Sequence, residues 1–327
     1  MTEIKAATEA AHDAGPEFST PAGDATALAA APAGAPTGAG APVVRRSRGE
    51  WLHFAIRNKK VVGGLGVLLG ILAIGVIAPL FLQYGPRERG VGPRNGAPSA
   101  DHWFGTTTFG EDVFTQVAYG IRATFLVAAL AAAVAALIGM TIGFVAGYVG
   151  GIIDEILMVI TNIVLVLPVF VVLIVITSYL GINNIPTQAL IIGVFAWPWV
   201  ARAVRAQTFS LRARDYVDLA RLTGVRPLSI IRKEIAPNMA SYLVMVFILL
   251  FAGAVLFAAA LDFLGLGPRE GMSLGLMLQL ATEWGALQLG IWWWFIPPGA
   301  IITMITGAAY VTNVGLDEVF NPKLRET

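Results

Sequence analysis

The feature that most constrains this chain is a series of apolar stretches, each long enough to cross a lipid bilayer. About 20 apolar residues in an α-helix span the hydrocarbon core, where backbone polar groups must be hydrogen-bonded within the protein. Hydrophobic residues make up 56% of the 327 residues and charged residues only 13%, whereas soluble domains have about one-quarter charged residues. The sequence therefore predicts an all-α polytopic membrane protein with six transmembrane helices, at about 61–83, 123–149, 156–180, 187–208, 240–261 and 291–315.

The segments outside these spans differ sharply in composition. Residues 1–44 are rich in Ala, Pro, Gly and Thr without an apolar period, so we predict a disordered extension, and not a signal peptide. Residues 45–60 contain six basic residues and are interpreted as a topology-setting flank, with an interfacial amphipathic helix as the alternative. We expect a large loop over 84–122 and a polar tail over 317–327.

The basic residues predict the orientation of the chain in the membrane. Lysine and arginine are more frequent in cytoplasmic than in external loops. With both termini inside, the inner segments after residue 44 contain 16 basic residues and the outer segments contain five. The N-terminus, the C-terminus and the charged region near residue 220 are therefore expected in the cytoplasm, and the 84–122 loop outside.

The charged region at 214–238 is the most unusual segment between the spans. A short helix is expected from about 214 to 222, and Gly224 follows it where a left-handed residue would end the helix. Pro227 suits the first turn of a second helix. That helix is expected to end before Pro237, because the residue preceding a proline is disfavoured in the α region. The segment thus predicts a helix, a glycine turn and a second helix.

Glycines recur every fourth residue in the second span and the turn after it. This spacing places them along one ridge, where the backbone of another helix could approach closely. Packing within the chain and a seam with another subunit both fit the pattern. The glycines are Gly139, Gly143, Gly147 and Gly151.

Two further residues stand out in the spans. Pro168 lies inside the third span and is expected to kink it. Asp262 is the one clear ionisable residue, at the outer end of the fifth span. We interpret it as a helix-end residue exposed at the membrane interface, with an ion or proton path as the alternative.

Motifs for catalysis or cofactor binding are missing from the sequence. The chain has no GxxxxGK[ST] phosphate loop, no HExxH, no GxSxG and no cysteine, so we expect no catalytic residues, no bound cofactor and no metal. The three histidines are far apart in sequence. A membrane domain without its own energy source favours a subunit driven by a partner, and an ion-coupled secondary transporter is the alternative from another class.

The charged region resembles the cytoplasmic coupling loop of permease subunits in bacterial ABC importers. The family pattern is roughly E-A-A, three residues, Gly, and then I-x-P; Asp218-Leu219-Ala220, Gly224 and Ile235-Ala236-Pro237 occupy these positions, and Leu219 departs from the pattern. The resemblance implies a type I importer permease fold with a coupling loop at 212–238. It also assigns contact with an ATPase subunit to Asp215, Asp218, Leu219, Ala220, Arg221, Gly224, Pro227 and Pro237.

A second set of motifs is similar to the C-type subunit of the dipeptide, oligopeptide and nickel group. The segment 102–126 resembles the group's H-x-x-G-T-D-x-x-G-R-D-V and Y-G-x-R, with Thr107 and Glu111 as departures. FLGLG at 263–267 and NPKLR at 321–325 are also typical of the group, although Asp262 stands where serine is usual. The residues assigned to the extracytoplasmic side are His102, Gly105, Asp112 and Arg122.

The resemblance also implies function, partners and location. It implies a permease subunit of an ATP-driven importer of di- or oligopeptides in the bacterial inner membrane, with nickel or another small solute as the alternative. The implied partners are a homologous second permease subunit, two ATPase subunits that use ATP and Mg²⁺, and an extracytoplasmic binding protein. Membrane lipid surrounds the chain, and no nucleic acid is expected.

Overall fold

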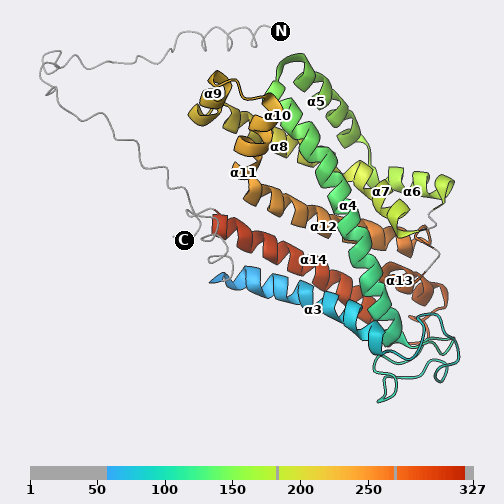
Figure 1. Ribbon diagram of the computed structural model, residues 1–327. Coiled ribbons are helices and arrows are strands. Elements are labelled where there is room, and N and C mark those ends of the chain that lie inside the picture. Colours follow the sequence, from blue (N-terminus) through green and yellow to red (C-terminus); the bar gives the residue numbers. More distant parts are fainter. Residues whose placement is uncertain (1–56, 182–183, 269–270, 321–327) are drawn as a thin grey trace, which may run out of the picture. The chain divides into compact units, whose positions relative to one another are not determined.

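The structure is a computed structural model that describes residues 57–181, 184–268 and 271–320 (Figure 1). The predicted extension at 1–44, most of the basic flank and the end of the tail lie outside the described residues. Within them every regular element is helical, apart from an isolated β-bridge between Thr106 and Asp112. The elements are α3 (Lys59–Phe81), α4 (Val113–Val149), α5 (Gly151–Val166), α6 (Val169–Leu180), α7 (Ile185–Ala196), α8 (Pro198–Arg212), α9 (Asp215–Leu222), α10 (Pro227–Ile230), the π-helical η1 (Ile231–Ile235), α11 (Ala236–Asn238), α12 (Ala240–Phe263), α13 (Leu274–Glu283) and α14 (Trp292–Phe320).

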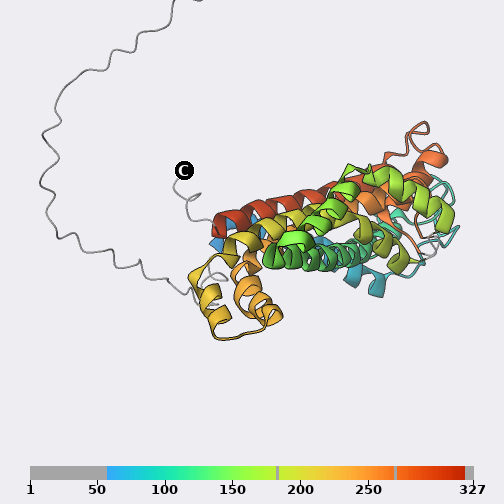
Figure 2. The same cartoon turned by 90° about the horizontal axis from the view of Figure 1, so that it is seen from above.

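Helix α4 is the central element. Its 37 residues correspond to about 55 Å at about 1.5 Å per residue, well above the roughly 30 Å of a bilayer core. It packs against α3, α7, α8 and α12. It also joins the two polar ends of the helical array, because the 82–112 loop lies at its start and α9–α11 lie near its end (Figures 1 and 2).

Two of the six expected spans are broken rather than continuous. Leu167 is extended before Pro168, and α5 and α6 meet at 80°. The expected kink at Pro168 is thus a complete break between two helices. A second break, which was not predicted, lies at Trp197-Pro198, where α7 and α8 meet at 51°. In both cases the residue before a proline, or the proline ring itself, interrupts the helical hydrogen bonds.

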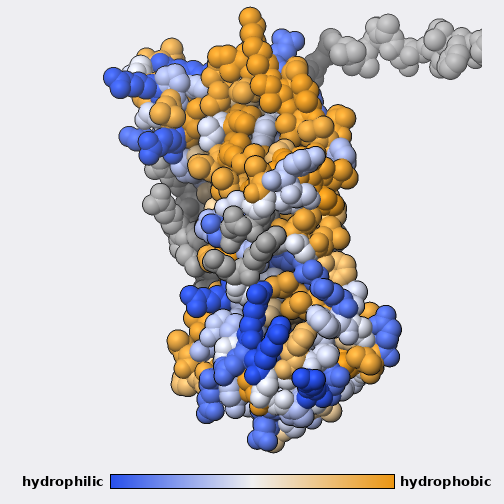
Figure 3. Space-filling view, turned by 90° about the vertical axis from the view of Figure 1, so that its right-hand side faces the viewer, coloured by the Kyte–Doolittle hydropathy of each residue, from blue (hydrophilic) through white to orange (hydrophobic). Residues whose placement is uncertain are grey.

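The described residues confirm the predicted helical membrane fold. Helices α3, α4, α12 and α14 are each long and apolar enough to cross a membrane, and the two bent pairs bring the number to six when each is taken as one span. Figure 3 shows hydrophobic residues over much of one face, whereas hydrophilic residues gather at the end formed by the 82–112 loop. The fold is that of a multi-pass membrane protein.

Several predicted boundaries were wrong. The expected loop over 84–122 is too long, because α4 begins at Val113, where the Asp112 side chain accepts a hydrogen bond from the backbone N–H of Thr115 at 2.8 Å. The polar tail expected from 317 begins as helix, since α14 continues to Phe320. The second large loop contains α13, which is capped by the Ser273 hydroxyl.

The glycine ridge packs against α8 of the same chain. A Cβ atom added at Gly139, Gly143 or Gly147 would lie 2.7–2.9 Å from atoms of α8 or of the residue just before it. The three glycines therefore allow the close approach that their spacing predicted. Gly151 does not belong to the ridge. The chain turns at Gly150 and Gly151, whose φ values are 71° and 60°, and Gly151 is the first residue of α5.

Candidate functional site

Residues 214–238 form an elbow of two short helical segments that projects from one end of the long helices (Figure 2). Helix α9 begins after Arg214, close to the predicted start, and ends before Gly224, which has φ +74°. The backbone N–H of Val225 donates to Ala220 O at 3.1 Å, and that of Gly224 donates to Arg221 O at 3.0 Å. This is the hydrogen-bond pattern of a Schellman turn, in which glycine avoids the steric cost of a left-handed residue.

The second arm of the elbow is longer than predicted. The helix was expected to end before Pro237, but it continues through α10, η1 and α11 to Asn238. The N–H of Ala236 donates to the carbonyl of Ile231, five residues earlier. Such a π-turn widens the helix locally, which lets the ring of Pro237 enter without the usual clash against the carbonyl four residues before it.

A buried hydrophobic root attaches the elbow to the long helices. Val217 from α9 and Ile230 and Ile235 from the second arm are almost fully buried. They belong to one cluster with residues of α4, α8 and α12, including Tyr148 and Val204. Because protein interiors are close-packed, a displacement of the elbow should displace α4, α8 and α12 as well, and not only deform the contact between them.

Polar contacts hold α9 in the same place. The Arg221 guanidinium lies 5.3 Å from the centre of the Tyr148 ring at the end of α4, within the range of a cation–π contact. It also forms a 2.9 Å ion pair with Asp218. Partial burial raises the pKa of the Tyr216 hydroxyl above its usual range.

The outer surface of the elbow is an apolar crest, which we define as Leu219, Leu222 and Leu228. Their exposed fractions are 64%, 85% and 65%. Ala220, which the resemblance assigned to the contact with the ATPase, instead packs against the buried root that contains Val217. Leu219, the departure from the family pattern, lies on the exposed side. The remaining assigned residues are also exposed: Asp215, Asp218, Arg221, Gly224, Pro227 and Pro237.

At the opposite end, the loop over 82–112 is held by polar contacts. His102 Nδ1 lies 2.9 Å from Asp112 Oδ1, and both side chains are buried. Gly105 has φ +67°, and a Cβ atom there would lie 2.7 Å from the Trp293 ring. Arg122 does not join this group: it is exposed on α4, and no ion pair involves it within the described part of the chain.

Asp262 was predicted to be exposed, and this was wrong. It is only 4% exposed, because the turn after α12 folds back over it through Gly265, whose φ is +75°. Asp262 Oδ1 accepts a hydrogen bond from Gln188 Nε2 of α7 at 2.6 Å, and Oδ2 accepts one from the Ser273 hydroxyl at 2.5 Å. The carboxylate therefore ties α7 and α12 to the start of α13.

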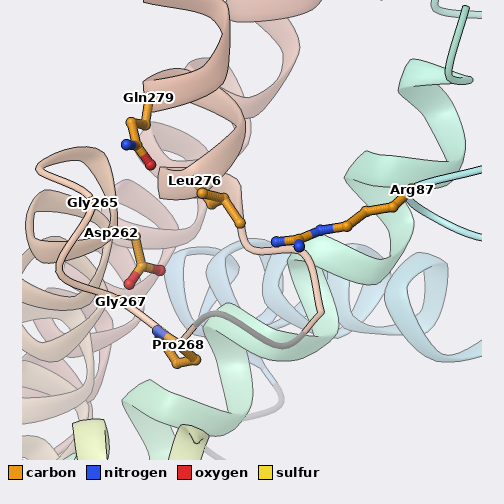
Figure 4. Close-up of a pocket in the computed structure, with 7 residues that line it drawn as sticks. All are labelled: Arg87, Asp262, Gly265, Gly267, Pro268, Leu276 and Gln279. Atoms are coloured by element: carbon orange, nitrogen blue, oxygen red, sulfur yellow. The ribbon is translucent and has the colours of Figure 1, made fainter. Parts of the chain in front are cut away.

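A cavity of about 320 Å³ opens beside Asp262 (Figure 4). The cavity was not predicted from the sequence, because its walls come from three separate parts of the chain: the 82–112 loop, α12 with the turn after it, and α13. Only the unusual aspartate before FLGLG could have drawn attention to this place. The lining residues are Arg87, Asp262, Gly265, Gly267, Pro268, Leu276 and Gln279.

The described residues contain no group of three His, Cys, Asp or Glu side chains that could hold a metal ion. The features above define a class: a multi-pass helical membrane protein with a rigidly rooted elbow at one polar end. Residues 139–326 match the family described as binding-protein-dependent transport system inner membrane component. The chain belongs to this family and is a permease subunit of the ABC importer type.

Curated relatives support this assignment over most of the chain. The chain is 32% identical to a Brucella suis protein named as a peptide permease, over 82% of this chain and 88% of that one. It is 34% identical to the dipeptide transport system permease protein of Bacillus subtilis, over 82% of this chain and 83% of the relative. A Brucella abortus protein named as a peptide transport system permease is 32% identical over 87% and 93% of the two chains.

Proposed function

We propose that this chain is a transmembrane subunit of an ATP-driven importer of di- or oligopeptides and forms half of the translocation path. The names of its relatives support the peptide substrate. The observation that carries the coupling role is the elbow, with exposed leucines outside and a fully buried root inside. Exposed apolar residues rimmed by charges are typical of a surface that binds another protein.

The crest binds a groove on an ATPase subunit, which holds ATP and Mg²⁺. Closure of two such ATPases moves the elbow, and the buried root passes this movement to α4, α8 and α12. The helices then tilt as units, as expected when packed elements have alternative arrangements. A second, homologous permease subunit completes the path. The 82–112 loop faces outward and receives a substrate-binding protein.

Single-cysteine crosslinking tests the docking site directly, since the native chain has no cysteine. We expect Leu222→Cys and Arg221→Cys to crosslink to the ATPase subunit in membranes that contain the whole transporter. Asn95→Cys, in the loop at the opposite end, is the control and should not crosslink. The absence of a crosslink at every position in 214–226 would contradict docking through the elbow.

A transport measurement distinguishes an ATP-driven importer from an ion-coupled secondary transporter. Reconstituted with its partners, the permease should accumulate labelled peptide only in the presence of ATP and the binding protein. Accumulation by this chain alone, driven by an ion gradient, would instead favour a secondary transporter.

A further inference from the structure

The Asp262 carboxylate is buried without an opposite charge in the described part of the chain. Its two hydrogen bonds come from the neutral side chains of Gln188 and Ser273, and none of the ion pairs among described residues includes it. Burying a carboxylate is costly unless a cation or several hydrogen bonds stabilise it. A neutral side chain such as asparagine or serine could join the same helices without the free-energy cost of burying a charge. The negative charge of Asp262 therefore points to a role beyond joining helices.

A second buried acceptor lies in the same cluster. Gln188 gives an amide N–H to Asp262, while its own Oε1 is fully buried and has no hydrogen-bond partner within the described residues. Buried polar atoms are rarely left unsatisfied. Gln188 does not line the cavity, so its oxygen is not open to a ligand and gives the Asp262 charge no compensation. Asp262 does line the cavity, and its uncompensated carboxylate is suited to a cationic group.

The other side of the cavity carries the opposite charge. Arg87 extends from the 82–112 loop, and its guanidinium reaches toward the cavity from the side opposite Gln279 (Figure 4). Arg87 makes no ion pair with a described residue. A guanidinium can bind a carboxylate through two parallel hydrogen bonds. The cavity therefore presents an anionic group and a cationic group around an open volume of about 320 Å³, within the usual size of small-molecule sites.

We infer that this cavity binds the charged ends of a zwitterionic peptide during transport, with Asp262 receiving the α-ammonium group and Arg87 the carboxylate. The inference rests on the proposed function as a peptide permease. A small inorganic cation fits less well, because the cavity offers one carboxylate and far more room than a single ion fills. The glycines at 265 and 267 serve the same site, since a Cβ atom at Gly267 would overlap the Asp262 side chain.

The test uses the complete transporter in proteoliposomes, with wild-type chain and Asp262→Asn. Asparagine keeps the size but removes the charge. Its carbonyl oxygen can still accept from Gln188, and its NH2 group can donate to the Ser273 hydroxyl, which donates in the wild type. The probes are labelled dialanine and propionyl-alanine, which has hydrogen in place of the ammonium group, each at a concentration that saturates the binding protein. We expect the variant to take up dialanine about tenfold more slowly, as for loss of a charge-assisted hydrogen bond, and propionyl-alanine at the wild-type rate.

Glu283→Gln is the matched control, because Glu283 is an exposed carboxylate at the end of α13 that does not line the cavity. Its uptake of both probes should equal that of the wild type. Arg87→Gln should slow the uptake of dialanine but not of alanyl-alaninamide, which lacks the carboxylate. An equal fall for dialanine and propionyl-alanine in Asp262→Asn would mean a structural role and overturn the inference, as would unchanged uptake of both.

Two further results keep this inference separate from others. Vesicles of phosphatidylcholine and phosphatidylglycerol contain no primary amine. If the difference in uptake between the wild type and Asp262→Asn appeared only after phosphatidylethanolamine was added, the ammonium group bound by Asp262 would belong to a lipid. That result would overturn the peptide site. If the wild-type transporter hydrolyses ATP in response to its binding protein but takes up neither peptide, the proposed peptide function itself fails.

Discussion

At the scale of single residues, glycine decides where the chain turns sharply. Gly224 ends α9 with φ +74°, and Gly265 ends α12 with φ +75°. Each turn makes the same pair of backbone hydrogen bonds, for example Leu266 N–H to Leu261 O at 2.9 Å after α12. A left-handed backbone costs about 1–2 kcal/mol for other residues. One turn shapes the elbow and the other encloses Asp262, so both candidate sites depend on a glycine.

The substitution Gly224→Asp should uncouple ATP hydrolysis from transport while the chain still inserts into the membrane. A Cβ atom at this position meets nothing within 4 Å in the chain itself. A new side chain therefore adds the strain of a left-handed backbone, about 1–2 kcal/mol, but no clash within the chain, and it would interfere with the docked partner. We expect at least about a tenfold loss of peptide uptake, the effect of about 1.4 kcal/mol in coupling. Uptake and ATPase activity are measured on the same proteoliposomes.

Gly290→Asp is the matched control for this substitution. Gly290 has φ +71° and is equally free of neighbours, but it lies in the turn between α13 and α14. Both variants carry similar backbone strain, so a difference between them isolates the elbow. Normal uptake by Gly224→Asp would count against docking at this turn.

At the scale of helices, apolar length alone predicted the elements that cross the array in one piece. The predicted boundaries of α12 and α14 lie within a few residues of the observed ones. In lipid, the backbone polar groups of a long apolar segment can all be hydrogen-bonded only when the segment is a continuous helix. It missed the break between α7 and α8, because proline in a membrane helix can produce either a kink or a break, depending on what packs around it. For the same reason, the helix was expected to end before Pro237, and the π-turn that lets it continue was not predicted.

The α4–α8 contact gives a prediction for the glycine ridge. A Cβ atom at Gly143 would lie 2.7 Å from the Ala201 carbonyl oxygen and from Val204 Cβ, and backbone atoms cannot move aside cheaply. Gly143→Leu should therefore force the helices apart and destabilise the chain by about 1–3 kcal/mol or more. The measurement is the amount of chain that remains monodisperse in mild detergent after heating.

Gly70→Leu provides the comparison for the ridge variant. Gly70 is an exposed glycine of α3, and a Cβ atom there meets nothing within 4 Å. The added leucine would face lipid and should leave stability unchanged. If both variants behaved like the wild type, α4 and α8 would not be packed as closely as the structure places them.

At the scale of the whole molecule, the sequence predicted the membrane fold and the elbow but not the cavity. The elbow is local: its turn, charges and prolines lie within 25 residues of one another, so their pattern is visible along the chain. The cavity is not local. Gln188 and Asp262 are 74 residues apart, and Arg87 comes from another loop, so no spacing rule brings them together. Asp262 could only be recognised as unusual, and its burial follows from how the turn folds back.

The last prediction concerns how the molecule sits in the membrane. Helix α4 joins the 82–112 loop to the elbow and, at about 55 Å, is longer than the bilayer core is thick, so its two ends must lie on opposite sides. The excess of basic residues in all the segments expected on the elbow's side of the membrane, 16 against five, predicts that the elbow is cytoplasmic. Asp101→Cys and Arg226→Cys place a single thiol at exposed positions of the two ends. In intact spheroplasts, a membrane-impermeant maleimide should label the first variant and not the second.

After the membrane is opened, both variants should react, which shows that each thiol is accessible. The reverse labelling would place the elbow outside, where it could not reach an ATPase that uses cytoplasmic ATP, and would overturn the proposed coupling role without touching the fold.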